Sequence, residues 1–258
     1  MVPPQAADLT ALVTGAARRI GAGLAEELAA MGHAVAIHHR GGGDEAAALA
    51  NRIEAVGGRA VAIHADLSTP QACQRLVEAA TRALGPVDVL VNNASRFEYD
   101  TLADLTPDGW ADHLAANLTA PIFLIQAFAS LLPADGKGVV VNILDQKVGR
   151  PNPDYFSYTA GKVALAGLTP ALALALAPRI RVCGLSPGLT LPSGPQSDDD
   201  YARAAAATPL GVTSSVAGLR RALRFIVESE ALTGQILTLD GGESLLKRGR
   251  DVAFDDRV

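Results

Sequence analysis

Short runs of β-branched and apolar residues alternate with long alanine-rich segments along most of this chain. The short runs are apolar throughout, which is typical of strands with both faces buried. The long segments repeat apolar residues at helical spacing. Strands of this kind joined by helices predict a parallel sheet covered on both sides. Seven strands are expected, at Thr10–Thr14, Ala34–His38, Ala60–His64, Val87–Val91, Gly138–Ile143, Arg181–Leu185 and Gln235–Leu239.

Right-handed crossovers between such strands give an α/β, doubly wound (Rossmann-type) fold with its ligand crevice at the carboxyl ends of the strands. No break in composition divides the 258 residues, so one domain is expected. The least regular stretch, Gly188–Thr208, predicts either a solvated loop or a mobile substrate lid. Helices are expected at Ile20–Met31, Glu45–Val56, Gln71–Ala83, Pro107–Leu131, Tyr155–Ala177 and Ser214–Glu228.

Charge and cysteine content narrow the range of partners. The net charge is −5 and the basic residues are scattered, which argues against nucleic acid or an anionic membrane as the main partner. Cys73 and Cys183 lie inside apolar segments, so buried thiols are expected, with no metal site and no disulfide framework. The first residues lack a basic start followed by an apolar stretch, so we expect no signal peptide and a cytoplasmic protein.

A glycine-rich turn follows the first predicted strand. Gly15, Gly21 and Gly23 lie between that strand and the first helix. Small residues let the backbone approach a pyrophosphate, and a helix N-terminus supplies free N–H groups and a positive dipole. The alternative is a tight turn without a ligand.

The end of the second strand bears on which nicotinamide cofactor is bound. A cofactor without a 2′-phosphate usually meets an acidic residue there, whereas this chain continues through His39 and Arg40 with no acid before Asp44. Together with Arg18 or Arg19, Arg40 can neutralise a 2′-phosphate, which favours NADPH. The alternative is an ordinary basic cluster on the surface.

Two further strand ends carry candidate cofactor contacts. Asp66 and Leu67 follow the third strand, where the carboxylate can lie beside the adenine amine; otherwise Asp66 is simply exposed and Ser68 or Thr69 caps the next helix. The segment from Asn92 to Ser95 follows the fourth strand, and its small and amide side chains suit a backbone that passes the nicotinamide ribose. Asparagine is also a good turn former.

Tyr158 and Lys162 stand four residues apart, so they share one face of a helix. An isolated phenol titrates near about 10, and a nearby ammonium is expected to lower that pKa toward the range needed for general acid–base work. Asp145 adds a carboxyl group thirteen residues before Tyr158. In an apolar cleft a carboxyl group gains affinity for a proton and can deliver it to an imine nitrogen. Asp145 can instead act as a cap in its own loop.

These residues resemble the short-chain dehydrogenase/reductase family over roughly residues 8 to 243. The motifs are Thr14-Gly15…Gly21, Asn92-Asn93-Ala94, Asn117, Tyr158…Lys162, Pro187-Gly188 and Asp240-Gly241-Gly242. The resemblance implies NAD(P)-dependent oxidoreduction, a homotetramer, and a water relay supported by Asn117. It implies cofactor contacts from Gly15, Arg18, Arg19, Ile20, Gly21, His39, Arg40, Asp66, Leu67, Asn93, Ala94, Ser95, Tyr158, Lys162, Pro187 and Gly188.

The chain departs from the family pattern at Arg19, where a glycine is usual, and at Asp145, where the catalytic serine is usual. Both departures resemble the pteridine reductases and bacterial dihydromonapterin reductases. That resemblance implies pterin contacts from Arg18, Ser95, Phe97, Asp145 and Tyr158, with Phe97 stacked on the pterin. The implied reaction is NADPH-dependent reduction of a dihydropterin, with Asp145 and Tyr158 sharing the protonation of ring nitrogen.

Two other functions remain open at this point: a ketone or alcohol reductase that tolerates Asp145, and a non-catalytic protein that senses NADP. The intact Asn117, Tyr158 and Lys162 speak against the second. Pro170 lies inside a predicted helix that commonly packs between subunits in the family, and proline tends to kink helices. We therefore leave the geometry of the oligomer open.

Overall fold

The computed structural model describes residues 9–192, 197–251 and 254. Seven parallel strands form one sheet in the order β3-β2-β1-β4-β5-β6-β7, which confirms the predicted doubly wound α/β fold. Most strands are buried on both faces, because helices cover both sides of the sheet. The strands are β1 (Thr10–Val13), β2 (Ala34–His39), β3 (Ala60–His64), β4 (Val89–Asn92), β5 (Gly138–Ile143), β6 (Ile180–Pro187) and β7 (Ile236–Leu239).

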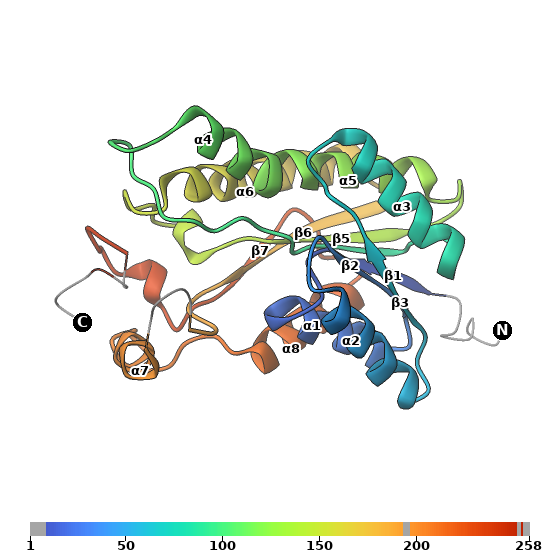
Figure 1. The fold of residues 1–258 in the computed structure, drawn as a ribbon, viewed down its shortest axis with the longest axis horizontal. Coiled ribbons are helices and arrows are strands. Elements are labelled where there is room, and N and C mark those ends of the chain that lie inside the picture. The colour runs from blue at the N-terminus through green and yellow to red at the C-terminus, as the bar shows by residue number, and fades with distance from the viewer. Residues whose placement is uncertain (1–8, 193–196, 252–253, 255–258) are drawn as a thin grey trace.

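Two helical layers enclose the sheet (Figure 1). One layer holds α1 (Arg19–Ala30), α2 (Gly43–Ala55) and α8 (Val216–Glu228). Leu24, Leu49 and Leu223 from these helices join the sheet residues of that face in one apolar core. The opposite layer holds α3 (Pro70–Leu84), α4 (Pro107–Leu114), α5 (Ala120–Leu131) and α6 (Phe156–Leu176).

The segment expected as one helix from Pro107 to Leu131 is divided. A π-helical turn, Ala115–Thr119, separates α4 from α5 and contains the buried Asn117. Such a turn inserts one extra residue, and π-turns are frequent at functional sites. The apolar periodicity continues across it, so the sequence pattern did not reveal the insertion.

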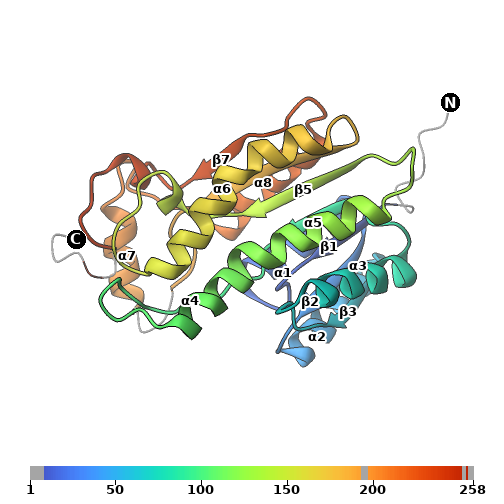
Figure 2. The same ribbon diagram turned by 90° about the horizontal axis from the view of Figure 1, so that it is seen from above.

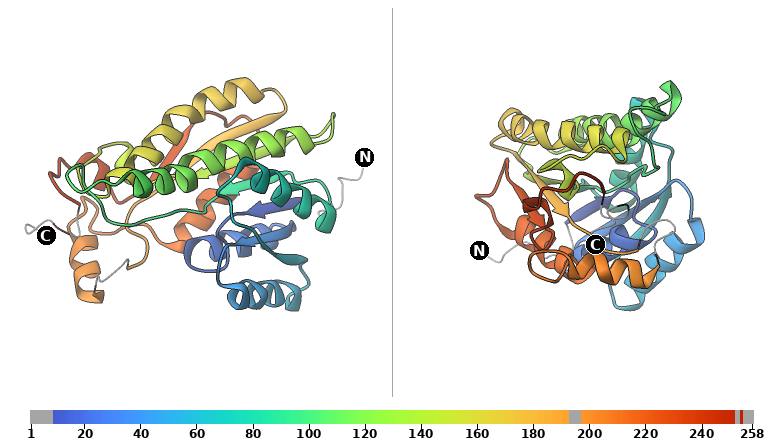
Figure 3. Two further views of the ribbon diagram at one scale, coloured as in Figure 1. Left: turned by 45° about the horizontal axis from the view of Figure 1, so that its top comes forward. Right: turned by 90° about the vertical axis from the view of Figure 1, so that its left-hand side faces the viewer.

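The segment Gly188–Thr208 is not simply a loop, because it contains α7 (Asp198–Ala206). The acidic run that predicted a solvated stretch forms the first turn of this helix. Ser197 and Asp200 make a reciprocal capping box, and negative charge there complements the helix dipole. Residues 193–196 of the expected lid lie outside the described part. Helix α7 lies beyond the carboxyl ends of the strands (Figure 2) and is the orange helix set apart from both layers in Figure 3.

A series of buried side-chain hydrogen bonds ties α6 to the middle of the sheet. The Asn92 amide of β4 donates to Asn142 of β5 (2.9 Å), and Asn142 donates to Thr169 of α6 (3.3 Å). Thr169 in turn donates to the Leu165 carbonyl (2.9 Å). Helix α6 continues past Pro170 to Leu176 without interruption. The residues that bear the predicted chemistry, at the other end of this helix, are therefore held by polar as well as apolar contacts.

Two segments, Pro107–Leu131 and Phe156–Leu176, are long and apolar enough by length and composition alone to cross a membrane. Their mean hydropathies are 1.6 and 1.5. In the fold these segments cover one face of the sheet, which is the usual place for apolar helices in a doubly wound domain. The apolar residues of α6 that do not face the sheet include Val163, Leu168 and Leu174, which are exposed.

Candidate active site

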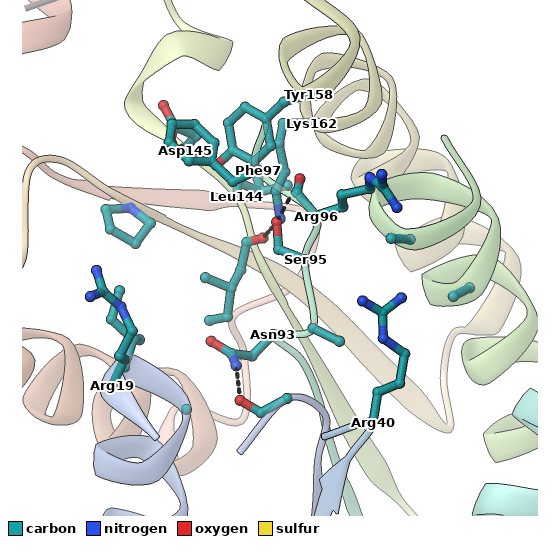
Figure 4. Close-up of a pocket in the computed structure, with 18 of the residues that line it drawn as sticks. Arg19, Arg40, Asn93, Ser95, Arg96, Phe97, Leu144, Asp145, Tyr158 and Lys162 are labelled. Carbon is teal, nitrogen blue, oxygen red and sulfur yellow. Dashed lines mark hydrogen bonds between the residues drawn. The ribbon is translucent and has the colours of Figure 1, made fainter. Parts of the chain in front are cut away.

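A cavity of about 920 Å³ opens at the carboxyl ends of the strands, where the topology predicts the ligand crevice. Figure 4 shows Phe97, Asp145, Tyr158 and Lys162 grouped on one side of it, with Arg19 and Arg40 on the other. The cavity is lined by all but one of the predicted site residues: Gly15, Arg18, Arg19, Ile20, Gly21, His39, Arg40, Asp66, Leu67, Asn93, Ala94, Ser95, Phe97, Asp145, Tyr158, Lys162, Pro187 and Gly188.

The glycine-rich turn is held tightly against the end of β4. Gly15 has φ of +61°, and a Cβ atom there would lie 2.9 Å from the Ala94 Cα. A Cβ on Gly21 would lie 2.4 Å from the Gly15 carbonyl oxygen. The Asn93 side-chain amide donates to the carbonyls of Thr14 (2.9 Å) and Gly15 (3.0 Å). The Asn93 side chain therefore fixes the backbone of the turn, and only glycine fits at positions 15 and 21.

His38 connects this turn to the third strand, a role that the sequence did not reveal. Its Nδ1 accepts from the Gly15 N–H (3.1 Å), so the proton must be on Nε2, which donates to the Ala65 carbonyl (3.1 Å). Burial is the largest of the causes that lower the pKa of His38 to about 4; the neighbouring His39 and His64 contribute, and the Ala65 carbonyl opposes the shift. The imidazole is therefore neutral near pH 7.

The predicted basic residues surround the part of the cavity nearest β1 and β2. Arg18 and Arg40 are exposed and line it. Arg19 has φ of +57°, a backbone conformation that residues other than glycine rarely adopt. Its guanidinium donates to the Pro192 carbonyl (3.0 Å). Arg19 thus bridges the glycine-rich turn and the segment after β6. His39 also lines the cavity, and its Nδ1 is buried without a hydrogen-bond partner among the described residues.

Asp66 lines the cavity, but its carboxylate is engaged locally. It accepts from the Ser68 N–H (3.0 Å), while Thr69 caps α3 by accepting from Ala72. The helix cap at Thr69 agrees with the sequence, and the adenine contact of Asp66 stays a prediction. Pro187 and Gly188 form the opposite wall, where a Cβ on Gly188 would lie 2.7 Å from the Asp240 Cα.

The side chains of Tyr158 and Asp145 are joined by a hydrogen bond. The Tyr158 hydroxyl donates to Asp145 Oδ2 across 2.8 Å, and the Lys147 N–H donates to Oδ1 across 2.8 Å. Burial raises the pKa of Asp145, against the lowering effect of these hydrogen bonds and of the Lys147 ammonium. Asp145 caps its own turn, as the alternative interpretation held, and it also accepts the hydrogen bond from Tyr158. A carboxyl group with raised proton affinity suits proton donation.

The expected effect of Lys162 on Tyr158 is not found in this structure. Burial, and then the charge of Asp145, raise the pKa of Tyr158 well above 10 instead of lowering it. The Lys162 ammonium turns toward the Ile143 carbonyl, to which it donates across 2.7 Å, and lies 5.7 Å from the centre of the Tyr158 ring. Burial lowers the pKa of Lys162 to about 8. Asp145 is therefore the dominant charge acting on the phenol.

Asn117 lies behind the cavity wall and does not line it. Its side-chain oxygen, Oδ1, accepts from the Ser95 hydroxyl (2.7 Å), and its side-chain nitrogen, Nδ2, donates to the Arg96 carbonyl (2.9 Å). It also abuts Gly161 of α6, where a Cβ would lie 2.9 Å from the Asn117 Cβ. The π-helical turn thus places Asn117 between the Ser95 segment and α6, so that it fixes the position of both.

Phe97 lies beside Tyr158 and is 42% exposed. Its ring stacks on Tyr155 with centroids 4.2 Å apart and an interplanar angle of 15°. Its edge contact with Tyr158 has centroids 4.7 Å apart and an angle of 82°. An exposed aromatic wall next to a proton donor can orient a flat heterocycle.

Several other residues of the cavity wall were missed from the sequence, among them Tyr155, Lys147 and Asp251. Tyr155 has φ of +54° and stacks on Phe97, yet nothing in its sequence neighbourhood predicts that conformation. Lys147 is a buried lysine whose position two residues after Asp145 offered a weak signal. Asp251 reaches the cavity from the far end of the chain, and no local pattern reveals such a contact. Both predicted buried thiols, Cys73 and Cys183, are buried and unpaired.

Comparison with known proteins places the chain in a family. Residues 9–200 match the family model described as short chain dehydrogenase. The crystal structure of FolM alternative dihydrofolate reductase 1 from Brucella suis in complex with NADP superposes with a TM-score of 0.91. It is 43% identical, covering 94% of this chain and 98% of that one.

Curated relatives with differing activities also match. Pteridine reductase 1 of Leishmania tarentolae is 36% identical, covering 92% of this chain and 96% of that protein. L-rhamnose 1-dehydrogenase (NAD(P)(+)) of Azotobacter vinelandii is 33% identical, covering 91% and 96%. The family model, the superposition and the hydrogen-bonded tyrosine in the crevice agree, and the chain belongs to the short-chain dehydrogenase/reductase family of oxidoreductases.

Proposed function

We propose that this protein is an NADPH-dependent reductase of dihydropterins, with dihydrofolate as a further candidate substrate. The observation that carries the proposal is the Asp145–Tyr158 hydrogen bond beside the exposed ring of Phe97 in one cavity. The similarity to the Brucella suis alternative dihydrofolate reductase and to the Leishmania pteridine reductase supports it.

The residues around the glycine-rich turn fit NADPH. Gly15 and Gly21 lie in the cavity wall next to the N-terminus of α1, and a helix N-terminus is suited to a pyrophosphate. Arg18 and Arg40 offer positive charge for a 2′-phosphate, and no acidic side chain ends β2. When bound, NADPH supplies the hydride that is transferred to the ring carbon of the substrate.

The protonation that accompanies hydride transfer falls to this chain's own residues. As electron density moves onto the ring nitrogen of the C=N bond, that nitrogen takes a proton from Asp145, and Tyr158 stabilises the resulting carboxylate by its hydrogen bond. A serine hydroxyl suits the alkoxide of a reduced ketone, whereas a carboxyl group with raised proton affinity suits nitrogen. Phe97 orients the flat ring.

A panel of substrates tests the proposal. Dihydromonapterin, dihydrobiopterin, dihydrofolate and simple ketones are each supplied with NADPH or NADH, and cofactor oxidation is followed by absorbance. We expect turnover of at least one dihydro compound, with a preference for NADPH. Turnover of ketones alone would select the carbonyl reductase, and NADPH binding without any turnover would select the sensing protein.

The proposal includes a homotetramer. The outward side chains of α6 include the exposed Val163, Leu168 and Leu174, and Phe225 is exposed on α8. Apolar side chains gathered on helix faces are typical of subunit contacts. Light scattering coupled to gel filtration measures the assembly, and a monomer at micromolar concentration would contradict this part of the proposal.

A further inference from the structure

Lys147 is a buried cation in the wall of the cavity and has no role in the proposed reaction. Its side chain is 7% exposed, and its ammonium lies 2.5 Å from the Asp251 carboxylate. The ammonium also donates to the Asp154 carbonyl (3.2 Å) and lies 4.7 Å from the centre of the Tyr155 ring. A buried lysine requires such partners, because desolvation of an unpaired ammonium is costly.

The backbone of Lys147 is hydrogen-bonded to Asp145, the proposed proton donor. The Lys147 N–H donates to Asp145 Oδ1, and the other carboxylate oxygen, Oδ2, accepts from the Tyr158 hydroxyl. The backbone of Lys147 therefore fixes the direction of the Asp145 carboxyl group, while its side chain supplies a positive charge that acts on that group. Asp145 caps the short turn that contains Lys147, so the backbone and the side chain of Lys147 act on Asp145 together.

Asp251 is held at this place by hydrogen bonds to Asp154 from Arg250 and Asp251, the two residues called the C-terminal segment below. Arg250 makes a bidentate contact with the Asp154 carboxylate, at 2.8 and 2.9 Å, and the Asp251 N–H donates to the same carboxylate across 2.7 Å. Asp154 is only 1% exposed, and it accepts a further hydrogen bond from Tyr99 (3.2 Å). Bidentate arginine–carboxylate pairs are geometrically specific, so the Asp251 backbone has little freedom.

Opposite charges therefore act on Asp145 from two parts of the chain. Lys147 lowers the pKa of Asp145 and Asp251 raises it. Two further titratable groups interact with Asp145: Tyr158 through its hydrogen bond and Lys162 through its charge, both on α6. Neither belongs to the C-terminal segment, so its removal or displacement would change only one of these charges.

We propose that Lys147 and Asp251 form a positioning pair for the proton donor, which couples the protonation of Asp145 to the docked C-terminal segment. The pair acts through Asp145 and does not itself transfer the proton. This inference rests on the proposed function only in naming the substrate nitrogen as the proton acceptor.

The test follows the Asp145 carboxyl group directly in the full-length protein. Its protonated form gives an infrared C=O band, identified by subtracting the spectrum of Asp145→Asn, and the band is titrated with pH. In Lys147→Met the midpoint should rise by about 1 pH unit, since a neighbouring positive charge is lost. Lys147→Arg should restore it, and Lys147→Met combined with Asp251→Asn should bring it back toward the wild-type value.

A second measurement relates the pair to turnover. The high-pH limb of kcat with a dihydropterin should move in the same direction as the infrared midpoint in each variant. Lys137→Met and Asp135→Asn provide matched controls, because both residues are exposed on the loop before β5. Circular dichroism checks folding; should Lys147→Met fail to fold, Asp251→Asn alone must lower the midpoint.

An unmoved midpoint in Lys147→Met, or an equal shift in the single and double variants, overturns the positioning role. The proposed function fails separately, when the wild-type protein does not reduce any pterin or folate although the infrared band titrates as expected. The two conclusions therefore stand or fall on different measurements.

Discussion

The Tyr158 hydroxyl donates its hydrogen bond to Asp145 Oδ2 at 2.8 Å, so the phenol and the carboxyl group form one proton-binding unit. Burial raises the pKa of both groups, and the charge of Asp145 raises that of Tyr158 further. As the pH rises, the carboxyl group of this pair loses its proton before the phenol does.

Replacing this carboxyl group should slow the reaction. Asp145→Ser should lower kcat for a dihydropterin by about 100-fold or more, because the donor matched to nitrogen is lost. The measurement is steady-state NADPH oxidation at saturating substrate. In the wild-type protein kcat should fall as the pH rises through the raised pKa of Asp145, since only the protonated carboxyl group donates. Unchanged kcat in Asp145→Ser would remove the donor role.

Removing the aromatic wall should weaken substrate binding more than chemistry. Phe97→Ala should raise KM for a dihydropterin by about 3- to 10-fold, corresponding to about 0.5–1.5 kcal/mol for a lost aromatic stack. Leu102→Ala is a suitable control, because Leu102 is 71% exposed on the same connection between β4 and α4. Equal KM values for both variants would show that the substrate does not use Phe97.

Arg40 should determine the preference for NADPH over NADH. Arg40→Ala should raise KM for NADPH by about 10- to 100-fold, since a charge-assisted hydrogen bond to a phosphate is worth about 1.5–3 kcal/mol. KM for NADH should stay nearly unchanged. Arg75→Ala, at an exposed arginine of α3, controls for loss of surface charge. A parallel loss with both cofactors would argue against a 2′-phosphate contact.

The glycine-rich turn should tolerate no side chain. Gly15→Ala should lower both the thermal midpoint and the affinity for NADPH, because φ of +61° and a contact of 2.9 Å with the Ala94 Cα both oppose a Cβ. Gly41→Ala is the matched control, since it lines the same cavity and a Cβ there meets nothing within 4 Å. Calorimetry and cofactor titration measure the two effects, and equal behaviour of both variants would refute the argument.

Acid should destabilise the protein in part through His38. Its pKa is about 4 in the folded protein against an ordinary value of 6.5 for histidine, so the unfolded chain binds a proton that the folded one excludes between these values. The stabilisation is complete above about 6.5 and declines as the pH falls toward 4, by about 3 kcal/mol in total. Denaturant unfolding of wild type and His38→Asn at several pH values tests this. The loss between neutral pH and pH 4 should be smaller in the variant.

The fold and most of the cavity wall could be predicted because they depend on local patterns. Apolar strands alternating with helices determine a doubly wound sheet, and the topology brings the ends of its strands together. What could not be predicted depends on contacts or insertions without a local signal. The π-helical turn at Asn117 leaves the apolar period intact, and α7 has little apolar periodicity beyond its cap. The Lys147–Asp251 pair joins residues about a hundred positions apart.

The predicted action of Lys162 on Tyr158 was wrong for a physical reason. Spacing on a helix correctly put both side chains on one face, but it did not indicate which acceptor the ammonium would choose. The Ile143 carbonyl at the end of β5 takes that hydrogen bond. Asp145 then determines the electrostatic environment of the phenol.

The hydrogen bonds from Asn92 through Asn142 to Thr169 have a consequence for the accuracy of the site. Apolar contacts between a helix and a sheet depend on shape alone and do not require one particular partner atom. A buried amide and hydroxyl have only one set of partners, so a shift of the helix along the sheet would strand polar atoms without water. These hydrogen bonds therefore fix the position of α6 along β5. That position in turn determines the distance between the Tyr158 hydroxyl and Asp145.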